Sequence, residues 1–167
     1  MTDSPAPIAT GPIVQIAWVV DDLDPLESLL RDQFGSTAWM RIPGVHFGPE
    51  SCEFRGAPAD FTADISLAYA GDLQLELIRP VSGDSIYTEF LDQHGPGLHH
   101  HCYEVDDIAA AMQRAEAAGF SVLQHGSMMG MMEFAYVDGA AAGAPYIELA
   151  RIGPEIKAMY DGIRNGG

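Results

Sequence analysis

The sequence has few basic residues. Only 8 of its 167 residues are lysine or arginine, against 24 aspartates and glutamates, and the formal net charge is −16. The basic residues are scattered along the chain, so they form no patch that a nucleic-acid backbone or an anionic membrane surface would bind. We therefore expect neither partner, and the same scarcity weighs against a heavily phosphorylated substrate.

Cysteines and long apolar runs are also scarce. Cys52 and Cys102 are too few for a disulfide framework. No apolar run approaches the roughly 20 residues that cross a bilayer, and the first residues lack the basic and apolar regions of a signal peptide. These absences predict a cytoplasmic protein. The length of 167 residues suits one domain or two small fused modules.

The first half of the chain contains clear strand and helix patterns. Residues 13–20 (IVQIAWVV) are typical of a strand. A helix is expected next, starting at Asp24 with Glu27 in a capping box and ending at Gly35. The expected apolar face of this helix consists of Leu26, Leu29, Leu30 and Phe34. Two further apolar runs around Gly71 and Asp72 predict a hairpin.

Two shorter helices are expected later in the chain. Residues 85–95 (SIYTEFLDQHG) predict a brief helix that ends at Gly95. Near the C-terminus, apolar residues recur at helical spacing, which predicts an amphipathic helix lying on the body of the protein or on a partner subunit. These residues are Ile156, Met159, Tyr160 and Ile163.

The sequence also repeats itself. QIAWVVDDL (15–23) lies over HHCYEVDDI (100–108) when residue 15 is aligned with residue 100, and both segments lead into an amphipathic helix. LQLELIRP (73–80) and PYIELARIGP (145–154) share a Glu-Leu pair, at 76–77 and at 148–149. Such similarity indicates a duplicated unit. The expected parts are an N-terminal flexible arm, a first module, a linker with a short helix, a second module, and a C-terminal helix and tail, at 1–12, 13–80, 81–96, 97–152 and 153–167.

Superimposing the two copies brings four candidate metal ligands to two equivalent positions. Gln15 falls over His100, and Glu76 falls over Glu148. Glu148 stands between Ile147 and Leu149 on an apolar strand, where an unpaired carboxylate would be costly to bury. The pattern therefore predicts one metal site formed by Gln15, Glu76, His100 and Glu148.

The other notable side chains have simpler interpretations. His99 and His101 flank His100, and strand alternation places both on the opposite face, where packing or a hydrogen bond is expected. The four methionines of residues 128–132 fit either a core filler or an adaptable apolar wall for a ligand. Solvent exposure is the expectation for the remaining histidines, His46, His94 and His125.

The segment GPGLHHHCYEVDDIAAAMQRAEAAGF (95–120), with LQLELI before it and YIELA after it, resembles the vicinal oxygen chelate superfamily. This superfamily includes glyoxalase I, methylmalonyl-CoA epimerase, extradiol dioxygenases and bleomycin-resistance proteins. The resemblance implies an α+β fold in which two tandem βαβββ modules form a cupped, incompletely closed mixed sheet around one metal ion. It also implies a homodimer and a small-molecule substrate.

The resemblance further implies an enzyme that holds one divalent ion, namely Zn, Co, Ni, Mn or Fe(II), through Gln15, Glu76, His100 and Glu148. The expected reaction is an isomerase or epimerase reaction, with proton transfer next to a carbonyl of a small, mostly apolar substrate. Glu148 is the expected proton shuttle, and no second base is assigned, although Glu53 and Asp64 lie in the right region. The Gln/Glu/His/Glu set resembles glyoxalase I, so a lyase of that kind is an alternative. A non-catalytic antibiotic-sequestering protein is another.

Overall fold

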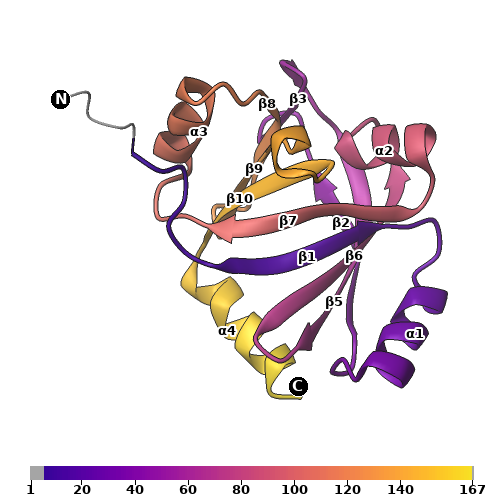
Figure 1. Ribbon diagram of the computed structural model, residues 1–167. Coiled ribbons are helices and arrows are strands. Elements are labelled where there is room, and N and C mark those ends of the chain that lie inside the picture. The colour runs from indigo at the N-terminus through magenta and orange to yellow at the C-terminus, as the bar shows by residue number, and fades with distance from the viewer. Residues whose placement is uncertain (1–5, 167) are drawn as a thin grey trace.

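The computed structural model describes residues 6–166, whose strands form one strongly curled sheet with helices around it (Figure 1). The helices are α1 (Asp24–Phe34), α2 (Ile86–His94), α3 (Ile108–Ala117), the 3₁₀ turn η1 (Ala140–Ala142) and α4 (Pro154–Arg164). The strands are β1 (Ile13–Val19), β2 (Met40–Phe47), β3 (Cys52–Phe54), β4 (Ala57–Pro58), β5 (Phe61–Ala70), β6 (Leu73–Ser82), β7 (Gly97–Glu104), β8 (Val122–Met128), β9 (Met132–Asp138) and β10 (Tyr146–Ile152).

The order of the strands divides the sheet into two related halves. The order is β2-β5-β6-β1-β7-β10-β9-β8-β3-β4. In the first half β1 runs parallel to β6, and in the second half β7 runs parallel to β10. The two halves join where β1 pairs antiparallel with β7. The short β3–β4 hairpin leaves the first half and pairs with β8 at the far edge.

The pairing register of the strands agrees with the alignment of the two sequence repeats. Gln15 pairs with Gln74 in the first half, and His100 pairs with Tyr146 in the second. Across the join, Gln15 faces Cys102 while His100 faces Ala17. When residue 15 is aligned with residue 100, and residue 76 with residue 148, the strand pairs of the first half therefore coincide with those of the second half. The α+β class with two repeated modules in a cupped mixed sheet is confirmed.

The curl of the sheet brings its distant parts together around a core. β2 contacts β8, although β2 begins the strand order and β8 stands near its other end, so the sheet is nearly closed. Phe47 of β2 stacks on Phe61 at 4.9 Å and meets Phe134 of β9 edge-on at 5.4 Å. These aromatic contacts link the two halves inside the cup.

Helix α4 lies against β5 on the open side of the cup (Figure 1). Its buried Ile163 packs with Leu67 and Tyr69 of β5. The C-terminal helix is therefore laid on the body of its own chain and covers residues of the sheet interior.

The hairpin and the helix expected around residues 63–95 are confirmed. β5 and β6 are joined through Gly71 and Asp72, and Gly71 has a φ of 63°, which glycine adopts without strain. Helix α2 begins after Ser85, whose hydroxyl accepts from the backbone N–H groups of Tyr87 and Thr88. The Thr88 hydroxyl accepts in turn from the backbone N–H of Ser85, which completes a capping box.

Helix α1 begins at Asp24 as predicted, but the predicted capping box does not form. The N-cap residue is Leu23, which offers no capping side chain, and the Glu27 carboxylate does not turn back to the helix end. Glu27 is instead buried and accepts hydrogen bonds from Arg41 and from the Ser66 hydroxyl. A cation and a hydroxyl from neighbouring strands stabilise this carboxylate better than the helix end does. The predicted apolar face is also only partly correct, because Phe34 is 70% exposed.

The N-terminal arm expected over 1–12 falls partly outside the described residues, which begin at residue 6. Ile8 and Ala9 pack against the core cluster beside α3, and the Ile8 carbonyl accepts a hydrogen bond from Arg114. Among the described residues, no helix combines the length and the apolar character that crossing a membrane requires.

Candidate metal centre

The four predicted ligands lie on the four central strands of the sheet. Gln15 is on β1, Glu76 on β6, His100 on β7 and Glu148 on β10, which are neighbours in the order β6-β1-β7-β10. The His100 Nε2 atom lies 3.0 Å from Glu148 Oε2, 3.6 Å from Glu76 Oε2 and 3.1 Å from Gln15 Oε1. Ligand atoms of Glu76, His100 and Glu148 all lie within 4.8 Å of one another. The structure therefore brings all four residues together.

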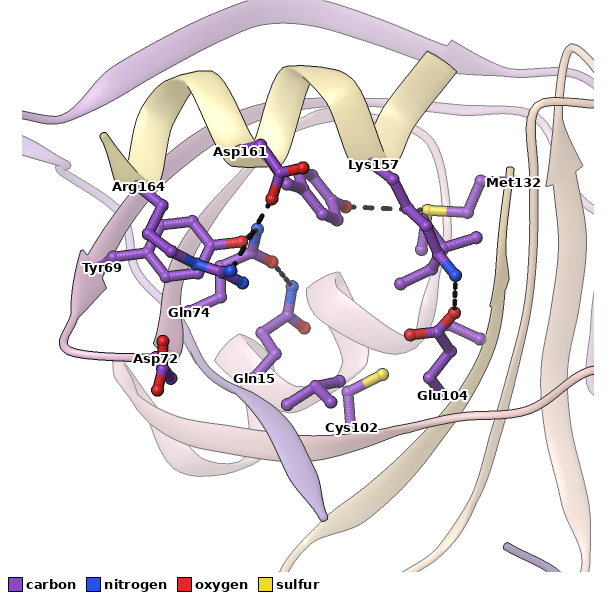
Figure 2. Close-up of a pocket in the computed structure, with 14 residues that line it drawn as sticks. Gln15, Tyr69, Asp72, Gln74, Cys102, Glu104, Met132, Lys157, Asp161 and Arg164 are labelled. Carbon is purple, nitrogen blue, oxygen red and sulfur yellow. Dashed lines mark hydrogen bonds and ion pairs between the residues drawn. The ribbon is translucent and has the colours of Figure 1, made fainter. Parts of the chain in front are cut away.

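The Gln15 amide oxygen is surrounded by hydrogen-bond acceptors. It lies 3.2 Å from Glu76 Oε2 and 3.2 Å from Glu148 Oε2. The Gln15 Nε2 group points away from these carboxylates and donates to Gln74 Oε1 at 2.6 Å, and Gln74 Nε2 donates to the Tyr69 hydroxyl (Figure 2). Three converging oxygens repel one another unless a cation lies among them or the amide turns its N–H₂ group inward.

Burial makes the cluster electrostatically demanding. It raises the pKa of the Glu76 carboxyl well above its ordinary value, and the nearby charge of Glu148 raises that pKa further. A divalent ion would replace the missing solvation and offset the repulsion between the two carboxylates. Three oxygen donors and one imidazole are also a ligand set that zinc, cobalt, nickel, manganese or iron(II) accepts. The residues present therefore fit a divalent cation.

A β-bulge in β7 gives two adjacent histidines access to the same interior. Ala17 pairs with His100, but the next residue, Trp18, pairs with Leu98, so His99 is an extra residue in the strand. His99 is fully buried, and its Nδ1 atom lies 2.8 Å from the Nδ1 atom of His100. The expectation that strand alternation places His99 on the opposite face is wrong, because the bulge interrupts the alternation.

The same irregularity occurs at the equivalent point of β1. Ile13 pairs with Tyr103 and Gln15 with Cys102, so Val14 is skipped. Val14 precedes Gln15 as His99 precedes His100, so the two skipped residues are equivalent in the repeat. Each module therefore has a bulge immediately before its first predicted ligand. A one-residue register change leaves no mark in an apolar–polar pattern, and sequence reasoning missed it.

The remaining histidines lie away from the centre. The exposed His46 contacts Asp60 at 2.7 Å, and His125 lies 3.7 Å from Glu53. His101 is half-buried with its ring near that of Tyr103. The predictions for these three side chains agree with the contacts, and none of them lies with the four converging donors.

A polar cavity of about 280 Å³ lies between the sheet and α4 (Figure 2). Gln15 and Cys102 line it from the sheet, and on the α4 side Lys157 makes an ion pair with Glu104. The Arg164 guanidinium lies 4.9 Å from the centre of the Tyr69 ring, which also lines this cavity. The charged side chains of its lining are Asp72, Glu104, Lys157, Asp161 and Arg164. The acidic groups outnumber the basic ones, so this cavity does not favour an anion.

A second, apolar cavity of about 240 Å³ adjoins the predicted ligands from the other side. Glu76 and Glu148 line it, whereas Gln15 lines only the polar cavity. Met132 and Tyr160 line both cavities, so the two cavities are neighbours. The methionines of residues 128–132 also line the apolar cavity, which favours the ligand-wall interpretation of that segment over the core-filler interpretation.

Comparison with known families decides the classification. Residues 14–136 match the model of the glyoxalase/bleomycin resistance protein/dioxygenase superfamily. The chain belongs to this superfamily. The match includes both bulges and three of the four converging side chains, and Glu148 lies just beyond its end.

The chain is also similar in sequence to two epimerases. The chain is 29% identical to the mitochondrial methylmalonyl-CoA epimerase of Mus musculus over 103 residues, which are 61% of this chain and 50% of that protein. It is 43% identical to the ethylmalonyl-CoA/methylmalonyl-CoA epimerase of Cereibacter sphaeroides over 54 residues, which are 32% of this chain and 40% of that protein. The matched region thus spans half or less of these relatives.

Solved structures of methylmalonyl-CoA epimerases share the fold. A methylmalonyl-CoA epimerase from Mycobacterium tuberculosis superimposes with a TM-score of 0.62 at 21% identity, over 90% of this chain and 93% of that chain. A Streptomyces coelicolor methylmalonyl-CoA epimerase variant in complex with 2-nitronate-propionyl-CoA gives a TM-score of 0.58 at 18% identity, over 86% and 95% of the two chains. The predicted glyoxalase-type fold is confirmed.

Proposed function

We propose that the protein is a divalent-metal-dependent epimerase that moves a proton at the carbon next to a carbonyl of a small, mostly apolar substrate. The supporting observation is the convergence of Gln15, Glu76, His100 and Glu148 beside an apolar cavity. The similarity of the chain to two epimerases supports this reaction.

The proposed ligands are Gln15 Oε1, His100 Nε2 and one carboxylate oxygen each from Glu76 and Glu148. A divalent ion held there would supply a Lewis acid, which would stabilise the negative charge that develops on a carbonyl oxygen when the neighbouring carbon loses a proton.

We propose that two carboxylates carry the proton. Glu148 comes from β10 and Glu76 from β6, on opposite sides of the central β1–β7 pair. Both line the apolar cavity, and among its described lining residues they are the only carboxylates. An epimerase removes a proton from one face of a carbon and returns one to the other face. We assign removal to Glu148, which would then release the proton to solvent, and the return to Glu76, which would take the proton that it delivers from solvent.

The other carboxylates considered for the second base are engaged elsewhere. Asp64 accepts hydrogen bonds from Arg79 and from the backbone N–H of Gly44, and Glu53 lies beside His125 on the surface. Neither Asp64 nor Glu53 lines the apolar cavity. Glu76 is the proposed second base because, unlike Asp64 and Glu53, it lines the apolar cavity.

Metal analysis and isotope exchange test this proposal. Purified protein is analysed for bound metal and then incubated in D₂O with methylmalonyl and ethylmalonyl thioesters, each made with CoA and with the uncharged N-acetylcysteamine. We expect one divalent ion per chain and deuterium at the α-carbon. Activity on the uncharged thioesters would show that the phosphate-bearing carrier is dispensable, as the acidic polar cavity suggests. Metal-free protein without exchange on any thioester would contradict the proposal and favour ligand sequestration.

The donor set also supports a second candidate, the glyoxalase I-like lyase. One amide, two carboxylates and one imidazole converge, as the resemblance to glyoxalase I implies. The same protein sample incubated with the hemithioacetal of methylglyoxal and glutathione tests this alternative. Thioester formation from the hemithioacetal, without α-carbon exchange in the malonyl thioesters, would replace the epimerase assignment by the lyase.

A further inference from the structure

We propose that the substrate carries, on the carbon that exchanges its proton, an apolar substituent larger than a methyl group, and that the apolar cavity holds this substituent. The inference rests on the proposed function, because it places the reacting carbon beside Glu76 and Glu148. It names the class of substrate: α-substituted carbonyl compounds with a branched alkyl or aromatic side group.

The position of the cavity leads to this inference. Glu76 and Glu148 line it, so a carbon that reaches either carboxylate holds its substituent within or beside this space. Gln15 lines only the polar cavity on the other side of the donors. The polar remainder of a substrate therefore has a separate space, and the apolar cavity is left for an apolar group.

The lining of the cavity selects for apolar groups. Apart from Glu76 and Glu148, the described residues that line it carry no charged side chain. The hydroxyls of Tyr87 and Tyr136 lie 2.7 Å apart and hydrogen-bond to each other, and the Tyr160 hydroxyl points to the Met132 sulfur at 3.9 Å. A polar substituent would find few free partners here and would lose its hydration.

The size of the cavity excludes a methyl group as a good fit. An apolar cavity of about 150 Å³ is large enough to bind benzene. The cavity here measures about 240 Å³. By that proportion it would hold a group of up to about ten carbon atoms. A methyl group would leave most of the space empty and forgo the contacts that the walls offer.

The walls that define this volume come from both modules and from α4. Methionines of the β8–β9 hairpin form one wall, and Met159 with Ile156 of α4 forms another. Ile42 and Leu67 face them from β2 and β5. Methionine adapts to ligands of different shape because its side chain is unbranched and polarizable. The hairpin and α4 are therefore the elements that set the range of substituents.

A binding experiment tests the cavity independently of catalysis. The full-length protein is labelled with methyl-¹³C methionine and titrated with n-butylbenzene, a neutral probe without a carbonyl group. We expect saturable shifts of the Met132 and Met159 methyl signals and unchanged signals from Met40 and Met112, which lie outside the cavity. Unchanged Met132 and Met159 signals would overturn the proposal.

A substrate series tests the same idea through the reaction. α-Proton exchange is compared for malonyl thioesters with 2-methyl, 2-ethyl, 2-butyl and 2-benzyl substituents. Each methylene that enters an apolar site contributes about a fourfold gain in kcat/KM, so the value should rise along the alkyl series. A 2-methyl thioester that matches or exceeds the larger members would overturn the proposal.

A matched pair of variants connects the preference to the cavity. Met159→Trp fills part of the space, and we expect the substituent that gives the highest kcat/KM to become smaller. Met40→Trp adds the same bulk at a half-exposed position of β2 outside the cavity, and the optimum should stay. If Met159→Trp does not fold, Leu67→Phe tests the opposite wall. An unchanged optimum in the folded cavity variant would contradict the inference.

These experiments distinguish failure of the proposed epimerase activity from failure of the proposed larger substituent. Probe binding at Met132 and Met159 without exchange on any thioester would support the apolar cavity as a binding site and overturn the epimerase. Exchange that is fastest with the methyl thioester, together with no probe binding, would support the epimerase and overturn the larger substituent.

Discussion

The Nδ1 atom of His99 lies 2.8 Å from the Nδ1 atom of His100. The Nε2 atom of His100 faces the carboxylates, so ligation of a metal through its lone pair would leave the proton on Nδ1, which would then donate to His99. Burial is the main cause that holds the pKa of His99 well below its ordinary value, and the proximity of His100 lowers that pKa further. His99 is therefore neutral and able to accept this hydrogen bond. It holds the His100 ring in one tautomer and one orientation.

Replacing His99 should weaken metal binding without unfolding the protein. His99→Phe keeps a ring among the neighbouring aromatic side chains but removes the acceptor, and loss of such a partner lowers metal affinity about 10- to 100-fold. His99→Asn retains an acceptor near the Nδ1 position and should lose less metal affinity than His99→Phe. Competition of Zn²⁺ and Co²⁺ against a chelator measures the affinities. His101→Phe, on the adjacent half-buried ring, is the control. Equal affinities for His99→Phe and the parent would remove this role.

Glu148→Gln should abolish deuterium incorporation while the protein stays folded. The amide retains an oxygen for the metal but has no basic site for a proton. Exchange is followed by mass spectrometry, and folding by circular dichroism and thermal denaturation. Glu133→Gln on the neighbouring strand β9 is a matched control, because Glu133 pairs with Arg151 away from the donors. Exchange that persists in metal-loaded Glu148→Gln would assign proton removal to another group.

The stability of the metal-free protein should fall as the pH rises. The pKa of Glu76 is raised in the folded state, so the folded protein binds more protons than the unfolded chain between the ordinary pKa and the raised one. The contribution of Glu76 to stability is therefore present below its ordinary pKa and is lost through that window. Urea unfolding with chelator, at several values between about pH 5 and pH 8, measures this loss.

Glu76→Gln provides the control for that prediction, because it removes the titrating group and should flatten the pH dependence of the metal-free protein. Metal affinity of the parent should change in the opposite sense and increase with pH, since binding displaces the Glu76 proton. A parent protein and a Glu76→Gln variant with the same pH profile would contradict the raised pKa.

Arg41→Met should destabilise the fold through Glu27. The Glu27 carboxylate is 6% exposed and accepts from Arg41 Nε at 2.9 Å and Nη2 at 2.7 Å. Without Arg41 only the Ser66 hydroxyl remains bound to this buried charge. Because the Arg41 side chain is half exposed, we expect the free energy of unfolding to fall by about 1–3 kcal/mol rather than the full cost of a buried pair.

Chemical denaturation measures the Arg41 effect against two controls. Arg31→Met breaks the exposed ion pair with Asp32 and should change stability by less than about 0.5 kcal/mol. The double variant Glu27→Gln with Arg41→Met should recover part of the loss, because it no longer buries an unpaired carboxylate. An Arg41→Met variant as stable as Arg31→Met would show that Glu27 does not depend on this pair.

The repeat and the strand periodicity determined the four converging residues. Side chains alternate along strands, and equivalent residues of a duplicated unit occupy equivalent places, so Gln15, Glu76, His100 and Glu148 could be predicted to converge before any coordinates. Local chemistry likewise determined the hairpin turn at Gly71 and the capping box of α2 at Ser85, because a few neighbouring residues decide each of these structures.

Tertiary structure decided what depends on contacts between distant segments. The bulge at His99 arises from the pairing of β7 with β1, and the binding of Glu27 to Arg41 arises where α1 meets β2. The apolar cavity exists only where α4 and the β8–β9 hairpin meet β2 and β5. A periodic pattern records which face of an element is apolar, but it contains neither the one-residue shift of a bulge nor the volume between walls that come from opposite ends of the chain.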